Sequence, residues 1–214
     1  MKIDVQYDES RTKQLQRNVI LSQAYRLIIE KGLQNVTMQD IAEASSIQRR
    51  TLYYYYSNKD AVAVELINCV INEFKNHTIY LPNYFTTGYA RIEYIFHYFL
   101  DYLLANEDVV LFTVQADYYY NKNYGESNPG QSFQSIYGQL ENVLYEDLER
   151  GMKDGSVKEQ FANNAKEVFF VIGSSIIALA QRLLHREEVI RTEAGYDRSS
   201  LKLQVELLLS GIKA

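Results

Sequence analysis

The chain has 214 residues, 47% of them hydrophobic and 13% aromatic, which is enough for a substantial core and for one or two domains. Its single cysteine, Cys69, excludes an internal disulfide framework and suits a reducing compartment. The N-terminus lacks the apolar region of a signal peptide, and no uninterrupted run reaches the roughly eighteen apolar residues of a membrane span, so we expect a cytoplasmic protein with no membrane partner.

The net charge of −5 is divided unevenly along the chain. Residues 1–60 contain nine Lys or Arg against seven Asp or Glu, a balance of +2, whereas the remainder contains thirteen against twenty, a balance of −7. This division is typical of a DNA-reading head attached to an acidic body. The excess is small, so we expect affinity for DNA to depend on a few well-placed contacts and on two heads acting together.

Two prolines and ten glycines are few for this length, which favours a mostly helical protein. The first helix is expected to run to about Lys31, where Gly32 ends it. Its predicted buried stripe consists of Ile20, Leu21, Ala24, Leu27 and Ile28. The start of this helix is basic, with Arg11, Lys13 and Arg17. These side chains would contact the phosphate backbone or a minor groove of DNA, or they are simply solvated at the start of the helix.

Residues 37–60, TMQDIAEASSIQRRTLYYYYSNKD, predict a helix-turn-helix followed by the cap of a connecting helix. Thr37 is the expected N-cap of the first helix, and Asp40 completes a pattern close to a capping box. Ser45 and Ser46 form the turn, and Ile47 fills the corner.

The second helix of this motif begins near Gln48 and has two different faces. Leu52 and Tyr56, four residues apart, are expected to point inward. The other face is basic and aromatic, as suits guanine edges, phosphates and thymine methyl groups. Asn58 caps the next helix, and Lys59 in its first turn is unfavourable to the helix dipole unless an anion approaches. The candidate DNA-binding residues are Thr37, Gln48, Arg49, Arg50, Thr51, Tyr53, Tyr54, Tyr55 and Lys59.

A long helix is expected from Asn58 to a break at Leu81-Pro82, since proline cannot continue a helix. The body then reads as five helices, for about nine in total: 87–105, 107 to about 120, 132–150, 163 to about 185, and 201–212. We therefore predict an all-α protein with a three-helix head at residues 11–60 and a larger helical body at residues 61–214.

The last two predicted helices are apolar on more than one face, which one subunit of this size cannot easily bury. The simplest solution is a homodimer in which these helices form a four-helix bundle with their partners. The alternative is that one of them is central in the body. In the dimer, two heads would read two half-sites of a near-palindromic operator.

Residues 20–62 resemble the DNA-binding region of the TetR family of bacterial transcriptional regulators. The matching positions are Gly32, Thr37, Asp40-Ile41-Ala42, Thr51-Leu52-Tyr53, Tyr55-Tyr56 and Lys59-Asp60. The chain departs from the family pattern at Ser46 in place of the turn glycine, at Gln48 in place of serine, at Arg50 in place of glycine and at Tyr56 in place of phenylalanine. Because Gln48 and Arg50 lie on the DNA side, the operator sequence of a relative does not carry over.

The resemblance implies a small-molecule pocket in the body and, for most members, repression relieved by a ligand that spreads the two heads. Aromatic side chains with a few polar tips suit an organic ligand, and Asp101, Asp117 and Glu141 would favour a lipophilic cation. For each single residue, core packing is the alternative interpretation. The candidate ligand-binding residues are Tyr94, His97, Tyr98, Tyr102, Phe112, Gln115, Tyr119, Phe133, Tyr137, Phe169 and Phe170.

Other function classes have less support in the sequence. Its three histidines are far apart and none lies in a zinc-binding pattern, and there is neither a phosphate-binding glycine loop nor a G-x-S-x-G motif. We therefore expect no enzyme activity, metal or cofactor. A nucleoid-type DNA binder without a ligand, or a regulator controlled by a protein partner, is the alternative.

Overall fold

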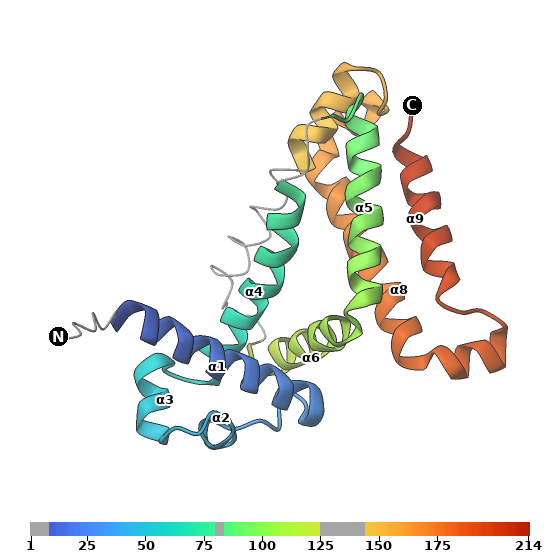
Figure 1. Ribbon diagram of the computed structural model, residues 1–214. Helices are drawn as coiled ribbons and strands as arrows, with labels where there is room; N and C mark the ends of the chain where they lie inside the picture. The colour runs from blue at the N-terminus through green and yellow to red at the C-terminus, as the bar shows by residue number, and fades with distance from the viewer. Residues whose placement is uncertain (1–8, 80–83, 125–143) are drawn as a thin grey trace, which may run out of the picture. The chain divides into compact units, whose positions relative to one another are not determined.

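The computed structural model describes residues 9–79, 84–124 and 144–214. Within these ranges the regular structure is helical, apart from an isolated antiparallel bridge between Val157 and Lys213, so the predicted all-α class is confirmed. The elements are α1 (Glu9–Lys31), α2 (Met38–Ala44), α3 (Arg49–Tyr55), α4 (Lys59–Ile79), α5 (Gly88–Ala105), α6 (Glu107–Tyr124), the 3₁₀ helix η1 (Glu159–Asn164), α8 (Ala165–Ala194) and α9 (Ser199–Ile212), and residues 144–153 are also helical (Figure 1).

The chain forms two compact units, which we call the head and the body. The head comprises Met1–Cys69 and Gln115–Asn123, and the body comprises Val70–Val114 and Tyr124–Ala214. The head therefore extends past the boundary predicted at residue 60 and includes half of α6, which the sequence assigned to the body. Helices α4 and α6 each run through both units without interruption.

The core of the head follows the predicted apolar stripes. Helix α1 packs on α2, and α2 packs on α3. Ile47 is half-buried at the corner, where full burial was expected. The buried side chains of the head include Ile20, Leu21, Ala24, Leu27, Ile28, Leu33, Val36, Ile41, Leu52, Tyr56, Val62 and Leu66.

Helix ends in the head occur where the capping residues predict them. Gly32 has a φ of +84° and its N–H donates to the carbonyl of Ile28 over 2.9 Å, which ends α1 in the left-handed conformation that glycine favours. The Asn58 side chain accepts a hydrogen bond from the N–H of Ala61 over 2.8 Å and begins α4.

The body is built around α5, α8 and α9, which pack on one another. Residues 144–153 cross the start of α5 at Gly88 and Gly151. A Cβ atom on Gly88 would lie 2.2 Å from the backbone nitrogen of Gly151, so this crossing requires glycine. Beside it, Arg91 donates to both carboxylate oxygens of Asp147, over 2.8 and 2.9 Å. Burial raises the pKa of the Asp147 carboxyl, and the charge of Arg91 opposes that shift.

Helix α8 is longer than its sequence pattern indicated. The prediction ended it near His185, but helical structure continues to Ala194 across a kink at Arg186, whose φ and ψ are −133° and 20°. Beyond the kink, Glu187 accepts hydrogen bonds from Arg198, which also donates to Glu107 at the start of α6. Both ion pairs lie in or beside a polar stretch that sequence periodicity assigns to a loop.

The region of α8 also corrects an expectation about membranes. The stretch Glu159–Ala194 contains an 18-residue window of mean hydropathy 1.6 that is long and apolar enough to cross a bilayer, and 39% of that window is buried within the chain. The apolar run in the sequence is interrupted by Gly173, Ser174 and Ser175. These small residues lower the mean hydropathy of the window only slightly and do not break the helix. The core helix of a soluble protein meets the same criterion.

Candidate nucleic-acid interface

The first helix of the motif, α2, begins with a complete capping box. Thr37 Oγ1 accepts a hydrogen bond from the N–H of Asp40 over 3.1 Å, and the Asp40 carboxylate accepts one from the N–H of Thr37 over 2.8 Å. Hydrogen bonds from Thr37 and then Lys31 lower the pKa of the Asp40 carboxyl to about 2. The acid is therefore ionised at the positive end of the helix dipole, as predicted.

The turn between α2 and α3 places a serine in a left-handed conformation. Ser46 has a φ of 55°, in the region that favours glycine, and it stands where the TetR pattern has glycine. Gln48 is the N-cap of α3 with an extended backbone, and its side chain makes no capping hydrogen bond. That side chain is exposed beside the start of the helix.

Helix α3 separates its inward and outward residues as the sequence predicted. Leu52 is 0% exposed and Tyr56, just after the helix, is 3% exposed, so both belong to the core. Around them Arg49, Arg50 and Thr51 are exposed, and Tyr53 and Tyr54 are 42% and 67% exposed. An exposed helix face with two arginines, two tyrosines and no acid can enter a major groove and offer donors to base edges and phosphates.

Local contacts orient several of these side chains before any DNA is present. Arg49 donates to the Tyr53 hydroxyl over 3.2 Å, and its guanidinium lies 5.4 Å from the centre of that ring. The Lys13 ammonium of α1 lies 5.6 Å from the centre of the Tyr54 ring. Lys13 thus adds positive charge next to the face of α3, whereas Arg17 is ion-paired with Glu65.

The predicted DNA-binding residues divide into three groups by their placement. Thr37, Gln48, Arg49, Arg50, Thr51, Tyr53 and Tyr54 are exposed on the head. Tyr55 is half-buried, with its ring 5.3 Å from that of Tyr54 in an edge-on arrangement. Lys59 is half-buried, and its ammonium donates to the backbone carbonyls of Leu33 and Gln34.

The predicted ligand-binding residues that the structure describes differ in burial and in the compact unit to which they belong. Phe112 and Phe169 are packed in the core, and Tyr94 and Phe170 are exposed. His97 and Tyr98 are half-buried on α5, where Tyr102 is buried. Gln115 and Tyr119 belong to the head, and Phe133 and Tyr137 lie outside the described residues.

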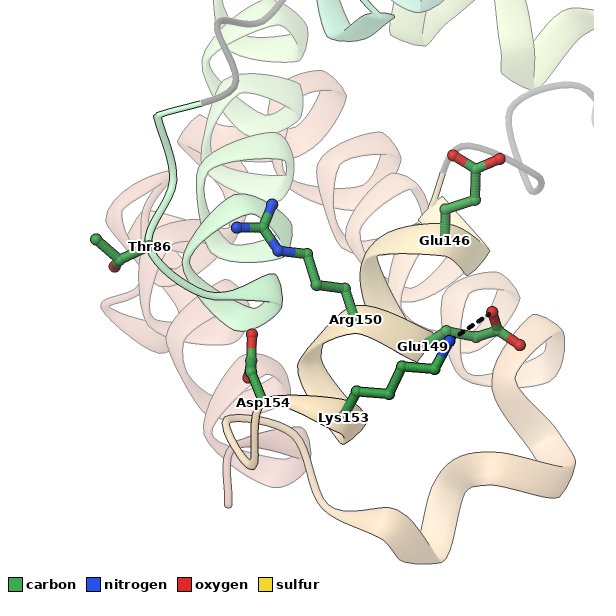
Figure 2. A pocket seen from close by; sticks show the side chains of 6 residues that line it. All are labelled: Thr86, Glu146, Glu149, Arg150, Lys153 and Asp154. Atoms are coloured by element: carbon green, nitrogen blue, oxygen red, sulfur yellow. Dashed lines mark ion pairs between the residues drawn. The ribbon is translucent and has the colours of Figure 1, made fainter.

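A surface pocket of the body lies elsewhere and has a different chemistry. It has a volume of about 350 Å³ and is lined by Thr86, Glu146, Glu149, Arg150, Lys153 and Asp154 (Figure 2). Glu149 and Lys153 are 3.8 Å apart within it. Its lining includes none of the predicted aromatic residues, so it is unlike the expected site for an organic ligand.

Sequence reasoning missed two clusters that the fold assembles. In the body, Glu73 of α4 accepts a hydrogen bond from the Tyr102 hydroxyl over 3.3 Å, and burial and then the charge of Glu73 raise the pKa of Tyr98. In the head, Gln115 and Tyr119 contact residues far away in the sequence. Neither grouping has a local sequence signal, because its members come from different helices.

Comparison with known proteins agrees with the geometry of the head. Residues 20–66 match the family described as bacterial regulatory proteins, tetR family. Over 131 residues the chain is 25% identical to IcaR of Staphylococcus aureus, the helix-turn-helix negative transcriptional regulator of the biofilm operon icaADBC. That match covers 59% of this chain and 62% of IcaR, which is slightly less than two thirds of the relative's length.

Solved structures resemble the chain over nearly its full length. The fatty acid degradation regulator FadR of Bacillus halodurans is 18% identical, with a TM-score of 0.71 over 92% of this chain and 95% of FadR. A protein of Saccharomonospora viridis in complex with choline is 17% identical, with a TM-score of 0.67 over 94% and 99%. At such identities the likeness shows a shared fold.

The family match, the capped helix-turn-helix and the shared all-α fold point to one assignment. The related proteins are regulators, which agrees with the prediction that the chain is not an enzyme. Residues 20–66 therefore match the TetR family of bacterial regulatory proteins, and the chain shares the fold of solved TetR-family regulators.

Proposed function

We propose that the protein is a cytoplasmic transcriptional regulator that binds a near-palindromic operator through α3 and represses transcription. The observation that carries this proposal is the exposed face of Arg49, Arg50, Thr51, Tyr53 and Tyr54 above a buried Leu52. Phosphate contacts would set the position of the helix, and the arginines would read base edges. The negative regulator IcaR, similar over more than half of this chain, supports repression.

Fluorescence anisotropy with DNA from upstream of the protein's own gene, compared with random DNA of equal length, tests this proposal. We expect a preference of at least about a thousandfold at physiological salt. Arg50→Ala should weaken specific binding by roughly 1–3 kcal/mol. Arg26→Ala, which removes an exposed arginine from α1, is the matched control and should bind like the wild type. Equal affinity for both DNAs would indicate the nucleoid-type alternative.

The proposal includes a homodimer formed by α8 and α9. The two helices pack on each other and contribute Ile172, Ile176 and Leu209 to the core of the body, yet they leave other apolar side chains in solvent. Leu203 and Leu207, one turn apart on α9, are 56% and 63% exposed. The exposed apolar residues of these helices are Phe170, Val171, Val189, Leu203 and Leu207, and a two-fold partner would bury them.

Sedimentation equilibrium tests the dimer. The wild type should sediment as a dimer, and Leu207→Glu should shift it toward monomer, because a buried unpaired charge is unfavourable at such an interface. Leu15→Glu places the same charge on an exposed leucine of α1 and should leave the dimer intact. A wild type that remains monomeric at high concentration would contradict the proposal.

For the effector, we favour a small organic cation bound near α5. Glu73 accepts a hydrogen bond from the Tyr102 hydroxyl, and its charge, after burial, raises the pKa of Tyr98, so a carboxylate acts on two tyrosines of the body. This combination attracts quaternary ammonium groups. The Saccharomonospora viridis protein of similar fold binds choline, which supports the same ligand class here.

Isothermal titration with choline, and with its neutral isostere 3,3-dimethylbutanol, tests this ligand class. We expect choline to bind more tightly than the isostere and to release operator DNA at saturation. Glu73→Gln should remove the preference for the cation. Unchanged operator affinity at saturating choline would reject a regulatory role for such a cation and would favour control by a protein partner.

A further inference from the structure

The second half of α6 is built into the DNA-binding head. Gln115–Asn123 belongs to the same compact unit as the helix-turn-helix. The Gln115 side-chain oxygen accepts a hydrogen bond from the N–H of Leu33 over 2.8 Å, across 82 positions of sequence. Leu33 lies in the connection between α1 and α2 and is itself buried, so Gln115 supplies the acceptor for a backbone donor of this connection.

Tyr119 makes the second contact from the same face of α6, since it follows Gln115 by four residues. Its hydroxyl donates to the Asp60 carboxylate over 2.8 Å. Asp60 lies in the first turn of α4, immediately after the helix-turn-helix. Gln115 and Tyr119 therefore hold the chain just before α2 and just after α3.

Lys59 connects these two contacts. Its ammonium donates to the carbonyl of Leu33 over 2.7 Å and to that of Gln34 over 3.2 Å, and it lies 4.8 Å from the centre of the Tyr119 ring. Two of its three donors are thus used within the head. Moving the side chain to a DNA phosphate would break both hydrogen bonds and the cation–π contact.

We propose that Lys59, Gln115 and Tyr119 form a positioning cluster that fixes both flanks of the helix-turn-helix, and that Lys59 promotes operator binding through the backbone of residues 33–34 and not by contacting a phosphate. This inference rests on the proposed DNA-binding function. It replaces the sequence-based expectation that Lys59 meets an anion, and it gives Gln115 and Tyr119 a role outside any ligand pocket.

The salt dependence of operator binding separates the two roles of Lys59. The logarithm of affinity falls with the logarithm of salt concentration, and each lost phosphate contact makes this negative slope shallower by about 0.9. Lys59→Met should weaken binding by roughly fivefold at every salt concentration, as expected for a lost hydrogen-bonded contact, and the slope should stay that of the wild type. Lys59→Arg should restore most of the affinity, because a guanidinium can donate to both carbonyls. A slope that is shallower than that of the wild type by about one unit in Lys59→Met would overturn the inference.

The α6 residues provide an independent test. Gln115→Leu and Tyr119→Phe should each weaken operator binding, with an unchanged salt slope, at temperatures where circular dichroism shows the variants to be folded. Amide hydrogen exchange at Leu33 should be faster in Gln115→Leu, because the N–H loses its acceptor. Tyr118→Phe, which changes the exposed neighbouring tyrosine, is the matched control and should match the wild type in both measurements.

The outcomes distinguish this inference from the proposed function. A wild type with no preference for any DNA would overturn the proposed function and, with it, the cluster's role in DNA binding. Specific binding by the wild type, together with wild-type affinity in Lys59→Met, Gln115→Leu and Tyr119→Phe, would overturn the inference alone. Lower melting temperatures with unaltered affinity would also overturn it, since the cluster would then only stabilise the fold.

Discussion

Ser46 shows at the scale of one residue how this chain departs from the TetR pattern that its helix-turn-helix matches. It adopts a left-handed φ of 55° in the turn between α2 and α3, where the family has glycine. A side chain in this region costs roughly 1–2 kcal/mol, because Cβ approaches a backbone oxygen. The turn is nevertheless formed, with Ile47 N–H donating to the carbonyl of Ala42 over 3.0 Å.

Ser46→Gly should therefore stabilise the protein. Glycine relieves the strain of the left-handed conformation. Its larger conformational entropy in the unfolded chain reduces this gain by roughly 0.5–1 kcal/mol but does not cancel it. We expect a net gain of about 0.5–1 kcal/mol in the free energy of unfolding, measured by urea denaturation. Ser46→Ala keeps the Cβ atom and should show no such gain. A less stable glycine variant would mean that the turn is not strained.

Tyr119 should make the stability sensitive to alkaline pH. Burial, and then its hydrogen bond to Asp60, raise the pKa of Tyr119 to about 12 from an ordinary value of 10. The folded protein retains this proton more strongly than the unfolded chain, so the stabilising contribution is complete below pH 10 and disappears as the pH rises through 12. Urea unfolding at about pH 9 and about pH 11 measures how much the free energy of unfolding falls between the two. This fall should be smaller in Tyr119→Phe than in the wild type, and in Tyr118→Phe it should equal that of the wild type.

At the scale of elements, α5 and residues 144–153 cross with their backbones in close approach at Gly88 and Gly151. Gly88 meets the backbone of Gly151 and the carbonyl of Asp147 at distances that leave no room for a Cβ atom. The buried Arg91–Asp147 ion pair lies at the same crossing. A change that separates the two backbones would therefore also alter the geometry of this ion pair.

Gly88→Ala should destabilise the protein by about 3 kcal/mol, near the upper end for overpacked sites, because the helices must separate. Differential scanning calorimetry gives the change. Gly211→Ala on α9 is the matched control, since nothing lies within 4 Å of the added Cβ atom, and it should alter stability by less than about 1 kcal/mol. Equal effects of the two substitutions would show that the close approach is not limiting.

At the scale of the whole molecule, the apolar side chains exposed on α8 and α9 predict that folding is coupled to association. For a dimer, dilution favours the unfolded chain, and each tenfold dilution lowers the stability by about 1.4 kcal/mol. The melting temperature should therefore rise with protein concentration. In Leu203→Glu this dependence should be weak. A concentration-independent melting temperature for the wild type would indicate that the helices are stable as a monomer.

The fold class, the helix-turn-helix and its exposed basic face could be predicted because they follow from local rules. Thr37, Gly32 and Asn58 cap helices through contacts within four residues, and Leu52 and Tyr56 lie on one face through the helical period. The extension of α8 to Ala194 could not be predicted from periodicity, because the residues that follow the kink at Arg186 are mostly polar and show no apolar stripe.

The sequence by itself thus determined the all-α class, the order of the helices and the surface proposed to meet DNA. Only the tertiary structure decided what Lys59, Gln115 and Tyr119 contact, and that Gln115–Asn123 belongs to the head. The physical reason is distance along the chain. Capping and periodicity act within one or two helical turns, whereas the hydrogen bond between Gln115 and Leu33 joins residues 82 positions apart, and only the folded chain brings them together.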